Sequence, residues 1–196
     1  MSRYRSILIF GAPGAGKGTI GKLLAGAGTV FHLSSGDMFR GMAPESEMGK
    51  LVHKFTSKGH LMPDDVAVEV WHRYVEGLIV TNRYFPHTQT LLLDGIPRTL
   101  KQAQALDAYI DVKHILLLDV ADEMVLIRRL VKRAVEEKRV DDKEEEVLKT
   151  RMEVYRRDTL QVLQHYPNEL ISRINADQKP LEVFKDILIK IIDIIK

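Results

Sequence analysis

The fold is decided by the stretch Ile7-Leu8-Ile9-Phe10-Gly11-Ala12-Pro13-Gly14-Ala15-Gly16-Lys17-Gly18-Thr19. Four apolar residues, typical of a buried strand, lead into a glycine-rich loop of the form G-x-x-x-x-G-K, and a helical pattern follows. Glycines let the backbone wrap closely and turn its N–H groups toward phosphate oxygens, and the start of the helix adds a positive dipole end. The stretch therefore predicts a loop that binds a nucleotide triphosphate, with the Lys17 ammonium on the β- and γ-phosphates.

This loop departs in one place from the common pattern. Gly18 follows Lys17, where most such loops have the serine or threonine that binds Mg²⁺, and Thr19 comes one position later. The loop alone therefore predicts nucleotide binding without specifying an enzyme.

Outward from the loop, short apolar runs alternate with longer amphipathic ones. Strands are predicted at 6–10, 30–33, 90–93, 113–120 and 171–175, and helices at 16–25, 47–57, 64–81, 100–109, 121–137, 143–165 and 180–195. This alternation predicts an α/β fold with a doubly wound, five-stranded parallel sheet flanked by helices. Ligands of such sheets bind beyond the carboxyl ends of the strands. We see no linker or repeat, so residues 1–196 are predicted to form a single domain.

Composition excludes several other classes of function. Lys and Arg number 29 against 27 Asp and Glu, a net charge of +2 that is too balanced for nucleic acid or a membrane as the main partner. The chain has no Cys, and its seven His residues show no metal-type spacing, so we expect no zinc. The lack of Cys is compatible with a reducing compartment, and a cytoplasmic monomer is expected.

Three further motifs follow the loop in order. The first is Leu33-Ser34-Ser35-Gly36-Asp37-Met38-Phe39-Arg40, and the second is Leu92-Leu93-Asp94-Gly95-Ile96-Pro97-Arg98-Thr99 with Gln102 after it. The third runs from Arg129-Leu130-Val131-Lys132-Arg133 through Arg139-Val140-Asp141-Asp142 to Arg151 and Tyr155. Together with the loop form G-A-P-G-A-G-K-G-T, these motifs resemble those of the adenylate kinases, nucleoside monophosphate kinases with a P-loop NTPase fold. The resemblance runs from residue 7 to about residue 195.

The resemblance implies reversible transfer of the γ-phosphoryl group of ATP, bound with Mg²⁺, to AMP, which gives two ADP. The residues implied to bind ATP are Gly14, Ala15, Gly16, Lys17, Gly18, Thr19, Arg129, Arg133 and Gln178. The residues implied to bind AMP are Ser35, Arg40, His60, Leu61, Met62, Gly95, Ile96, Pro97, Arg98, Gln102, Arg139 and Arg151. The implied catalytic set is Lys17, Arg98, Arg133, Arg139 and Arg151.

These residue types suit the chemistry. Phosphoryl transfer depends on alignment and charge neutralisation more than on covalent work, and guanidinium groups stay charged and bind phosphate oxygens bidentately. A base is not needed, because the phosphate acceptor is already largely ionised above a second pKa near 6. For Mg²⁺, the pattern alone leaves Asp94 and Asp119, each at a strand end, as alternatives. The resemblance favours Asp94 acting through water, and Asp119 is then expected to cap the next helix.

Departures from the family pattern are few. Ile96 replaces a Phe, Ile20 replaces a frequent Gln, and the stretch 139–151 is one residue longer than usual, which leaves Lys149 as an alternative to Arg151. Only residues 134–138 separate Arg133 from Arg139, so this is the short-lid form without the inserted subdomain that can hold zinc in some relatives.

Water is the competing acceptor, so the site is expected to close before transfer. Adenylate kinases are themselves a standard example of lid closure. The segments expected to move are an AMP-binding helical segment, about 35–66, and a short lid, about 133–142.

Two alternatives remain. UMP/CMP-type kinases share most of these motifs but usually have Asn after the Pro-Arg pair, whereas Thr99 and Gln102 favour AMP. A P-loop protein that binds nucleotides as a switch or adaptor, without turnover, is less consistent with so many arginines.

Overall fold

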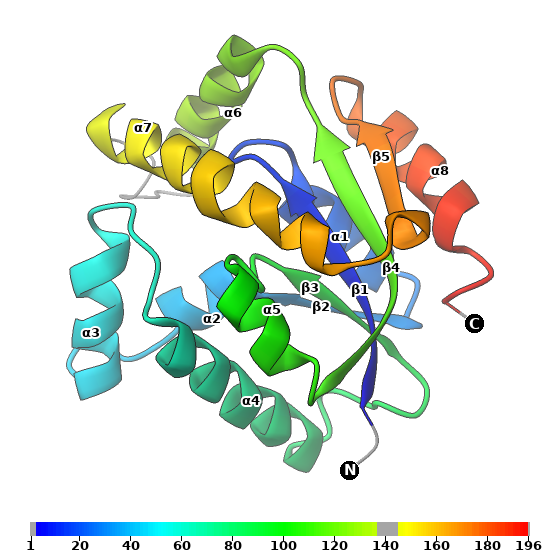
Figure 1. Ribbon diagram of the computed structural model, residues 1–196, viewed down its shortest axis with the longest axis horizontal. Helices are drawn as coiled ribbons and strands as arrows, with labels where there is room; N and C mark the ends of the chain where they lie inside the picture. The colour runs from blue at the N-terminus through cyan, green and yellow to red at the C-terminus, as the bar shows by residue number, and fades with distance from the viewer. Residues whose placement is uncertain (1–2, 137–144, 196) are drawn as a thin grey trace.

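The computed structural model describes residues 3–136 and 145–195 (Figure 1). Its first half contains β1 (Tyr4–Gly11), α1 (Lys17–Ala25), β2 (Val30–Ser34), α2 (Ser35–Arg40), α3 (Glu47–Thr56), α4 (Asp64–Val80) and β3 (Thr90–Asp94). Its second half contains α5 (Leu100–Leu106), β4 (Ile110–Asp119), α6 (Glu123–Glu136), α7 (Glu145–Val154), η2 (Tyr155–Thr159), η3 (Leu160–His165), η4 (Asn168–Leu170), β5 (Ile171–Asn175) and α8 (Pro180–Ile191).

The five strands form one parallel sheet in the order β2-β3-β1-β4-β5, as predicted. The chain first goes to one side of β1, for β2 and β3, and then crosses to the other side for β4 and β5. Such a reversal leaves a crevice at the carboxyl end of the central strand, where ligands bind. Asp94 pairs in register with Ile9 and with Ser34, so the ends of β1, β2 and β3 meet at this edge.

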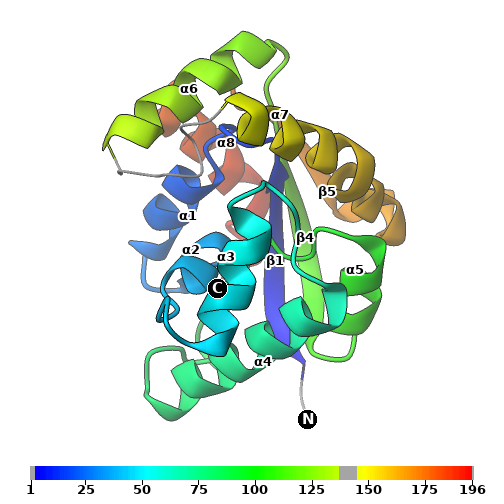
Figure 2. The same ribbon diagram turned by 90° about the vertical axis from the view of Figure 1, so that its left-hand side faces the viewer.

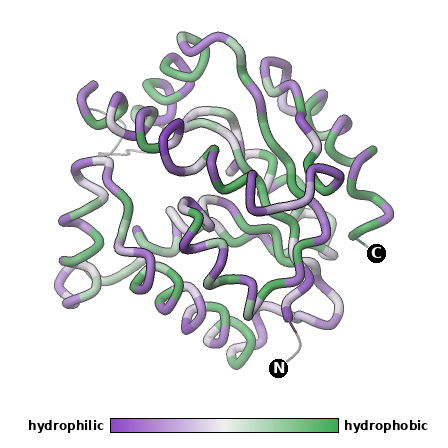
Figure 3. The backbone as a smooth tube through the Cα atoms, viewed as in Figure 1, coloured by the Kyte–Doolittle hydropathy of each residue, from purple (hydrophilic) through white to green (hydrophobic). Residues whose placement is uncertain are grey.

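The central strand β1 is buried on both faces over most of its length because its residues alternate between two apolar cores. Leu8 and Phe10 of β1 belong to a core with residues of α4, α5 and η3. Ile7 and Ile9 belong to the opposite core, which α1 and α8 cover. The carboxyl-terminal parts of β1, β3 and β4 are accordingly runs of apolar residues, whereas the helices around them alternate between hydrophobic and hydrophilic stretches (Figure 3).

The segment containing α2 and α3 lies to one side of the sheet, with α6 and α7 beside it (Figure 2). This segment has a small apolar cluster of its own, formed by Val52, Met62 and Ala67, against which Phe39 and Phe55 pack. The turn after α3 approaches α7 closely: a Cβ at Gly59 would lie 3.0 Å from the Val147 carbonyl oxygen. Met38 of α2 belongs to the core that also contains Leu8 and Phe10, so the segment is joined to this core through α2 and contacts α7 at its other end.

The predicted helix over 143–165 differs from the structure. Its described part divides into the α-helix α7, the π-helical turn η2 and the 3₁₀ segment η3. The apolar spacing of a helix does not distinguish the i→i+4 hydrogen bonds of an α-helix from the i→i+5 bonds of a π turn, so the sequence pattern could not show this change. The last helix is also shorter than predicted and ends at Ile191, although Ile195 stays buried.

A helix needs about 20 consecutive and mostly apolar residues to cross a bilayer. Within residues 3–136 and 145–195, no helix is both long enough and apolar enough to cross a membrane.

Candidate active site

The phosphate-binding loop joins β1 to α1 and has a backbone that few side chains would permit. Gly14 has φ +86°, and a Cβ there would lie 2.6 Å from the Leu126 carbonyl oxygen. Glycine is therefore needed both for the left-handed conformation and for the close approach of α6. Helix α1 begins at Lys17, so its free N–H groups and its positive dipole end face the loop.

The Lys17 side chain is folded back onto this loop. Its Nζ donates hydrogen bonds to the carbonyl oxygens of Gly11, at 2.7 Å, and Ala12, at 3.1 Å. Burial lowers the pKa of Lys17 to about 8, and the positive charges of Arg98, Arg151 and Arg133 act in the same direction. The Asp94 carboxylate opposes this shift. The ammonium group therefore lies in a region of positive potential that an anionic ligand would neutralise.

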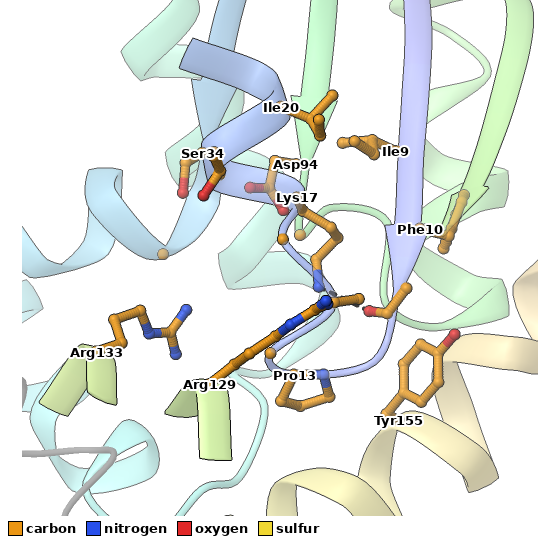
Figure 4. Close-up of a pocket in the computed structure, with 18 of the residues that line it drawn as sticks. Ile9, Phe10, Pro13, Lys17, Ile20, Ser34, Asp94, Arg129, Arg133 and Tyr155 are labelled. Carbon is orange, nitrogen blue, oxygen red and sulfur yellow. Dashed lines mark hydrogen bonds between the residues drawn. The ribbon is translucent and has the colours of Figure 1, made fainter. Parts of the chain in front are cut away.

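A cavity of about 460 Å³ opens beside this loop, at the carboxyl edge of the sheet. Its cationic lining residues come from separate parts of the chain: Lys17, Lys22, Arg40, Arg98, Arg129, Lys132, Arg133 and Arg151. Only Asp37, Asp94 and Glu136 among the described lining residues are acidic. Figure 4 shows Lys17 and Asp94 near the loop, with Arg129 and Arg133 entering from α6. The cavity is thus strongly cationic within a chain that is nearly neutral, which suits a ligand with several phosphates.

One end of the cavity lies between α6 and the start of α8. Arg129 donates from Nη1 to the Ala176 carbonyl oxygen at 3.0 Å, and its Nη2 is 3.8 Å from Asp177. Gln178 turns its Nε2 to the Asn175 carbonyl oxygen and to Asp186, at 2.8 and 2.9 Å. The Arg129 guanidinium is therefore held in place, while the side-chain amide of Gln178 is directed toward α8.

The other end of the cavity is built around Arg98. The Arg98 side chain donates from Nε to the Gly95 carbonyl oxygen at 2.6 Å. Its backbone N–H donates to Gln102 Oε1 at 2.8 Å, and its carbonyl oxygen accepts a hydrogen bond from Thr159 Oγ1 at 3.2 Å. Three different segments thus fix this one residue.

Neighbouring groups complete this end. Ser35 Oγ donates to the Gly95 carbonyl oxygen at 2.7 Å and so joins α2 to the loop after β3. Gly95 has φ +80°, and a Cβ there would lie 2.8 Å from Arg98 Nη2, so only glycine leaves room for the guanidinium. Arg40 Nη2 lies 2.5 Å from Asp37 Oδ1 on α2.

Asp94 and Asp119, the two alternatives for Mg²⁺, have different surroundings. Asp94 lines the cavity and is 7% exposed, and the buried His32 Nε2 lies 3.6 Å from its Oδ2. A carboxylate oxygen beside the phosphate loop, with the Thr19 hydroxyl nearby, fits an ion that arrives on a nucleotide and keeps several waters. Asp119 does not line this cavity and is 3.9 Å from Arg173. The expectation that Asp119 caps the next helix is wrong, because Asp122 accepts the hydrogen bond from the Met124 N–H, at 2.8 Å.

Within the described residues, no group of three or more His, Asp or Glu side chains could hold a metal ion.

Most of the implied site residues meet at the cavity, including Gly14 to Thr19, Arg40, Leu61, Gly95, Pro97, Arg98, Arg129, Arg133, Arg151 and Gln178. Ser35, His60, Met62, Ile96 and Gln102 do not line it. Arg139 lies outside the described residues, as do Asp141 and Asp142. Of the two alternatives on α7, Arg151 lines the cavity, whereas Lys149 pairs with Glu145 at 2.8 Å.

Sequence reasoning missed two supporting residues, Asp64 and Thr159. Asp64 accepts hydrogen bonds from Thr99 Oγ1, at 2.7 Å, and from Gln102 Nε2, at 3.0 Å. Thr159, in the π-helical turn, donates a hydrogen bond from its hydroxyl to the Arg98 carbonyl oxygen. Neighbouring residues in the sequence do not reveal either role, because an Asp is common in the first turn of a helix and a Thr is ordinary within a helical pattern.

The fold and this site define a class of protein: a P-loop nucleotide-binding protein whose cationic cavity extends well beyond the loop. Comparison with known proteins makes the class specific. The family model for adenylate kinase matches residues 9–171. An adenylate kinase of Flavobacterium psychrophilum is 38% identical over 169 residues, which cover 83% of this chain and 85% of that protein.

Two more adenylate kinases show the same likeness. That of Rhodopirellula baltica is 39% identical over 166 residues, covering 82% of this chain and 80% of that protein. That of Bacteroides fragilis is 33% identical over 189 residues, covering 93% and 95%. The chain therefore belongs to the adenylate kinase family.

Proposed function

We propose that the cavity is the site at which this enzyme moves the γ-phosphoryl group of ATP reversibly to AMP, giving two ADP. The observation that supports this most is the pairing of two cationic ends in one cavity, the phosphate loop with Arg129 and Arg133, and Arg98 with Arg40. A protein that only binds one nucleotide does not need the second end. The UMP/CMP-type and switch alternatives are not favoured by the comparisons.

On the donor side, the backbone of Gly14 to Thr19 holds the ATP phosphates. Lys17 exchanges its hydrogen bonds with the loop carbonyls for bonds to the β- and γ-phosphates. Arg129, anchored by Ala176, stacks on the ATP base, and the backbone at Gln178 contacts that base. Arg133 approaches the transferred group from the last turn of α6.

On the acceptor side, Arg40 and Arg98 hold the AMP phosphate, and Arg151 faces the same space from α7. An oxygen of this phosphate attacks the γ-phosphorus while the bond from phosphorus to the β,γ-bridging oxygen breaks, so that both products are ADP. The arginines and Lys17 neutralise the charge that spreads over the transferred oxygens.

Magnesium enters with the nucleotide as part of the substrate, and Asp94 is proposed to orient it through water. The ion supplies charge neutralisation between the β- and γ-phosphates. Asp94 and the Thr19 hydroxyl are the protein oxygens proposed to face it. The lack of Cys makes a thiolate zinc site impossible.

Gln102 is proposed to recognise the base of AMP through hydrogen bonds. Gln102 is 3% exposed, so the base reaches it only after the part of the 35–66 segment ahead of Asp64 changes position. Asp64, at the start of α4, is proposed to keep its hydrogen bond to Gln102 during this movement. The corresponding lid, about 133–142, includes residues outside the described part of the chain. A single domain of 1–196, a monomeric state and a cytoplasmic location stay predictions.

The test is a phosphotransfer assay with ATP and Mg²⁺ against AMP, CMP, UMP and GMP, with the Gln102→Ala variant in parallel. We expect ADP formation with AMP at a kcat/KM about ten- to a hundred-fold above the others, and a smaller preference in the variant. Equal rates with all four acceptors in the wild type would contradict the proposed choice of AMP.

A further inference from the structure

The carboxamide of Gln102 is part of a small buried hydrogen-bond network between α4 and α5. Asp64, the first residue of α4, accepts from Thr99 Oγ1 at 2.7 Å and from Gln102 Nε2 at 3.0 Å, both at Oδ1. Thr99 Oγ1 in turn accepts from the backbone N–H of Gln102 at 3.1 Å, as the N-cap of α5. On its other side, Gln102 Oε1 accepts from the Arg98 N–H at 2.8 Å.

The network determines which way the amide faces. An ionised carboxylate can only accept hydrogen bonds, and a backbone N–H can only donate. The amide nitrogen must therefore face Asp64, and the amide oxygen must face Arg98. A flipped amide would place oxygen against carboxylate and N–H against N–H, which leaves buried polar groups unpaired. One N–H and one lone pair of the carboxamide remain for a ligand.

We propose that Asp64 is a positioning residue that determines base specificity by locking the Gln102 amide in one orientation. The inference rests on the proposed function, because it takes Gln102 as the reader of the acceptor base. Asp64 touches neither substrate phosphate nor the reacting atoms, so its effect passes through Gln102.

The locked orientation distinguishes 6-amino from 6-oxo purines. Adenine offers an N6–H donor beside the N1 acceptor, which match an amide oxygen and an amide N–H. Hypoxanthine reverses both groups, because it carries an oxygen at position 6 and a hydrogen on N1. Inosine monophosphate therefore needs the flipped amide, and it is otherwise the same size and charge as AMP.

The experiment compares kcat/KM for AMP and for inosine monophosphate, at saturating ATP, in four variants and the wild type. Asp64→Ala removes the lock, and Asp64→Asn keeps an acceptor oxygen at the same place. Asp65→Ala is the matched control, because Asp65 lies in the same first turn of α4 but is exposed. Gln102→Ala removes the reader itself. ATP KM and melting temperature are measured for each protein.

We expect a wild-type preference for AMP of about ten- to a hundred-fold that falls several-fold in Asp64→Ala, through a lower kcat/KM for AMP and a higher one for inosine monophosphate. Asp64→Asn and Asp65→Ala should keep the preference, and ATP KM should stay the same in all. The role of Asp64 is refuted if Gln102→Ala reduces the preference for AMP but Asp64→Ala does not. It is also refuted if Asp65→Ala has the same effect as Asp64→Ala. In both cases the role of Gln102 stands. If Gln102→Ala keeps the wild-type preference for AMP over inosine monophosphate, Gln102 does not recognise the base.

If Asp64→Ala unfolds, Asp64→Asn with Thr99→Val decides the question. Thr99→Val removes one of the two hydrogen bonds to Asp64 and should narrow the preference part of the way. If Thr99→Val leaves the preference for AMP unchanged, the hydrogen bond that holds Asp64 in place does not affect the choice of base, which overturns the lock.

Discussion

The two ends of the cavity are built in different ways. The donor end centres on a continuous stretch, Gly11 to Thr19, in which backbone groups and Lys17 are proposed to bind the phosphates. The acceptor end gathers Arg40, Arg98 and Arg151 from distant parts of the chain. It is held by side-chain hydrogen bonds between segments that are far apart in the sequence, such as those from Thr159 to Arg98, 61 positions apart, and from Ser35 to Gly95, 60 positions apart.

This difference has a physical consequence. The phosphate loop keeps its shape as long as β1 and α1 pack on the sheet, so side-chain substitutions at the acceptor end should leave ATP binding nearly unchanged. An end assembled from side-chain hydrogen bonds depends on each bond, because losing one leaves a buried polar group unpaired. Substitutions at the donor end should therefore affect the binding of ATP, and substitutions at the acceptor end should affect the binding of AMP.

The largest effect is expected for Arg133→Ala. Its guanidinium is proposed to act on the transferred group, and arginines in that role contribute roughly 3–5 kcal/mol to transition-state stabilisation. We expect kcat to fall accordingly, with little change in AMP affinity. The matched control is Arg128→Ala on the same helix, because Arg128 is exposed, lies 4.0 Å from Asp122 and does not line the cavity. If Arg133→Ala changed only the affinity for AMP, the proposed donor-side role of Arg133 would be contradicted.

Lys17→Met should follow closely. Removing a preorganised positive charge aimed at the developing charge lowers kcat by about a hundred- to a thousand-fold. The fold should survive, since within residues 3–136 and 145–195 the side chain donates hydrogen bonds to the carbonyl oxygens of Gly11 and Ala12, both in its own loop. Steady-state kinetics and the melting temperature check this, with the exposed Lys185→Met as control. Unchanged turnover in the folded variant would refute the role of Lys17.

A third, smaller effect concerns pH. The pKa of Lys17 is lowered to about 8 without nucleotide, mainly by burial, so the free enzyme loses this charge as the pH rises through 8. Bound phosphates favour the ammonium and raise its pKa, so ATP binding takes up a proton above pH 8. ATP affinity should fall about tenfold between pH 7 and 9. Calorimetry in buffers of different ionisation enthalpy measures the uptake, which Lys17→Met should abolish.

The smallest effect is expected for Thr159→Val. The variant leaves the Arg98 carbonyl oxygen without its hydrogen bond from Thr159 Oγ1, which should raise the KM for AMP about three- to tenfold. Thr150→Val is the control, because its hydroxyl bonds within α7 to the Glu146 carbonyl oxygen. Equal changes in the KM for ATP and AMP would argue that Thr159 supports the whole domain and not the acceptor end.

The sequence predicted the donor end more completely than the acceptor end, because the two ends are built in different ways. The phosphate loop and the five strands depend on neighbouring residues, so glycine spacing and apolar runs such as 7–10 were enough to predict them. Arg40, Arg98 and Arg129 all line the cavity, and the binding roles that the family resemblance implied for them stay predictions.

What could not be predicted depends on contacts between elements. Nothing local shows that Asp64 fixes the amide of Gln102, since 38 positions separate them. The π-helical turn at Tyr155–Thr159 is hidden because its apolar spacing is that of an ordinary helix. Gln102 was predicted to face the base, and the structure shows a side chain whose oxygen and one N–H already have partners.

The most direct test of the two-ended cavity is equilibrium binding of ATP and of AMP, measured separately by calorimetry, to Arg129→Ala and Arg40→Ala. Arg129 lines the end anchored at Ala176, and Arg40 lines the end near Arg98. We predict that Arg129→Ala weakens ATP about tenfold and leaves AMP unchanged, and that Arg40→Ala does the reverse. If either variant weakened both nucleotides equally, or weakened the wrong one, the division of the cavity into a donor and an acceptor end would be contradicted.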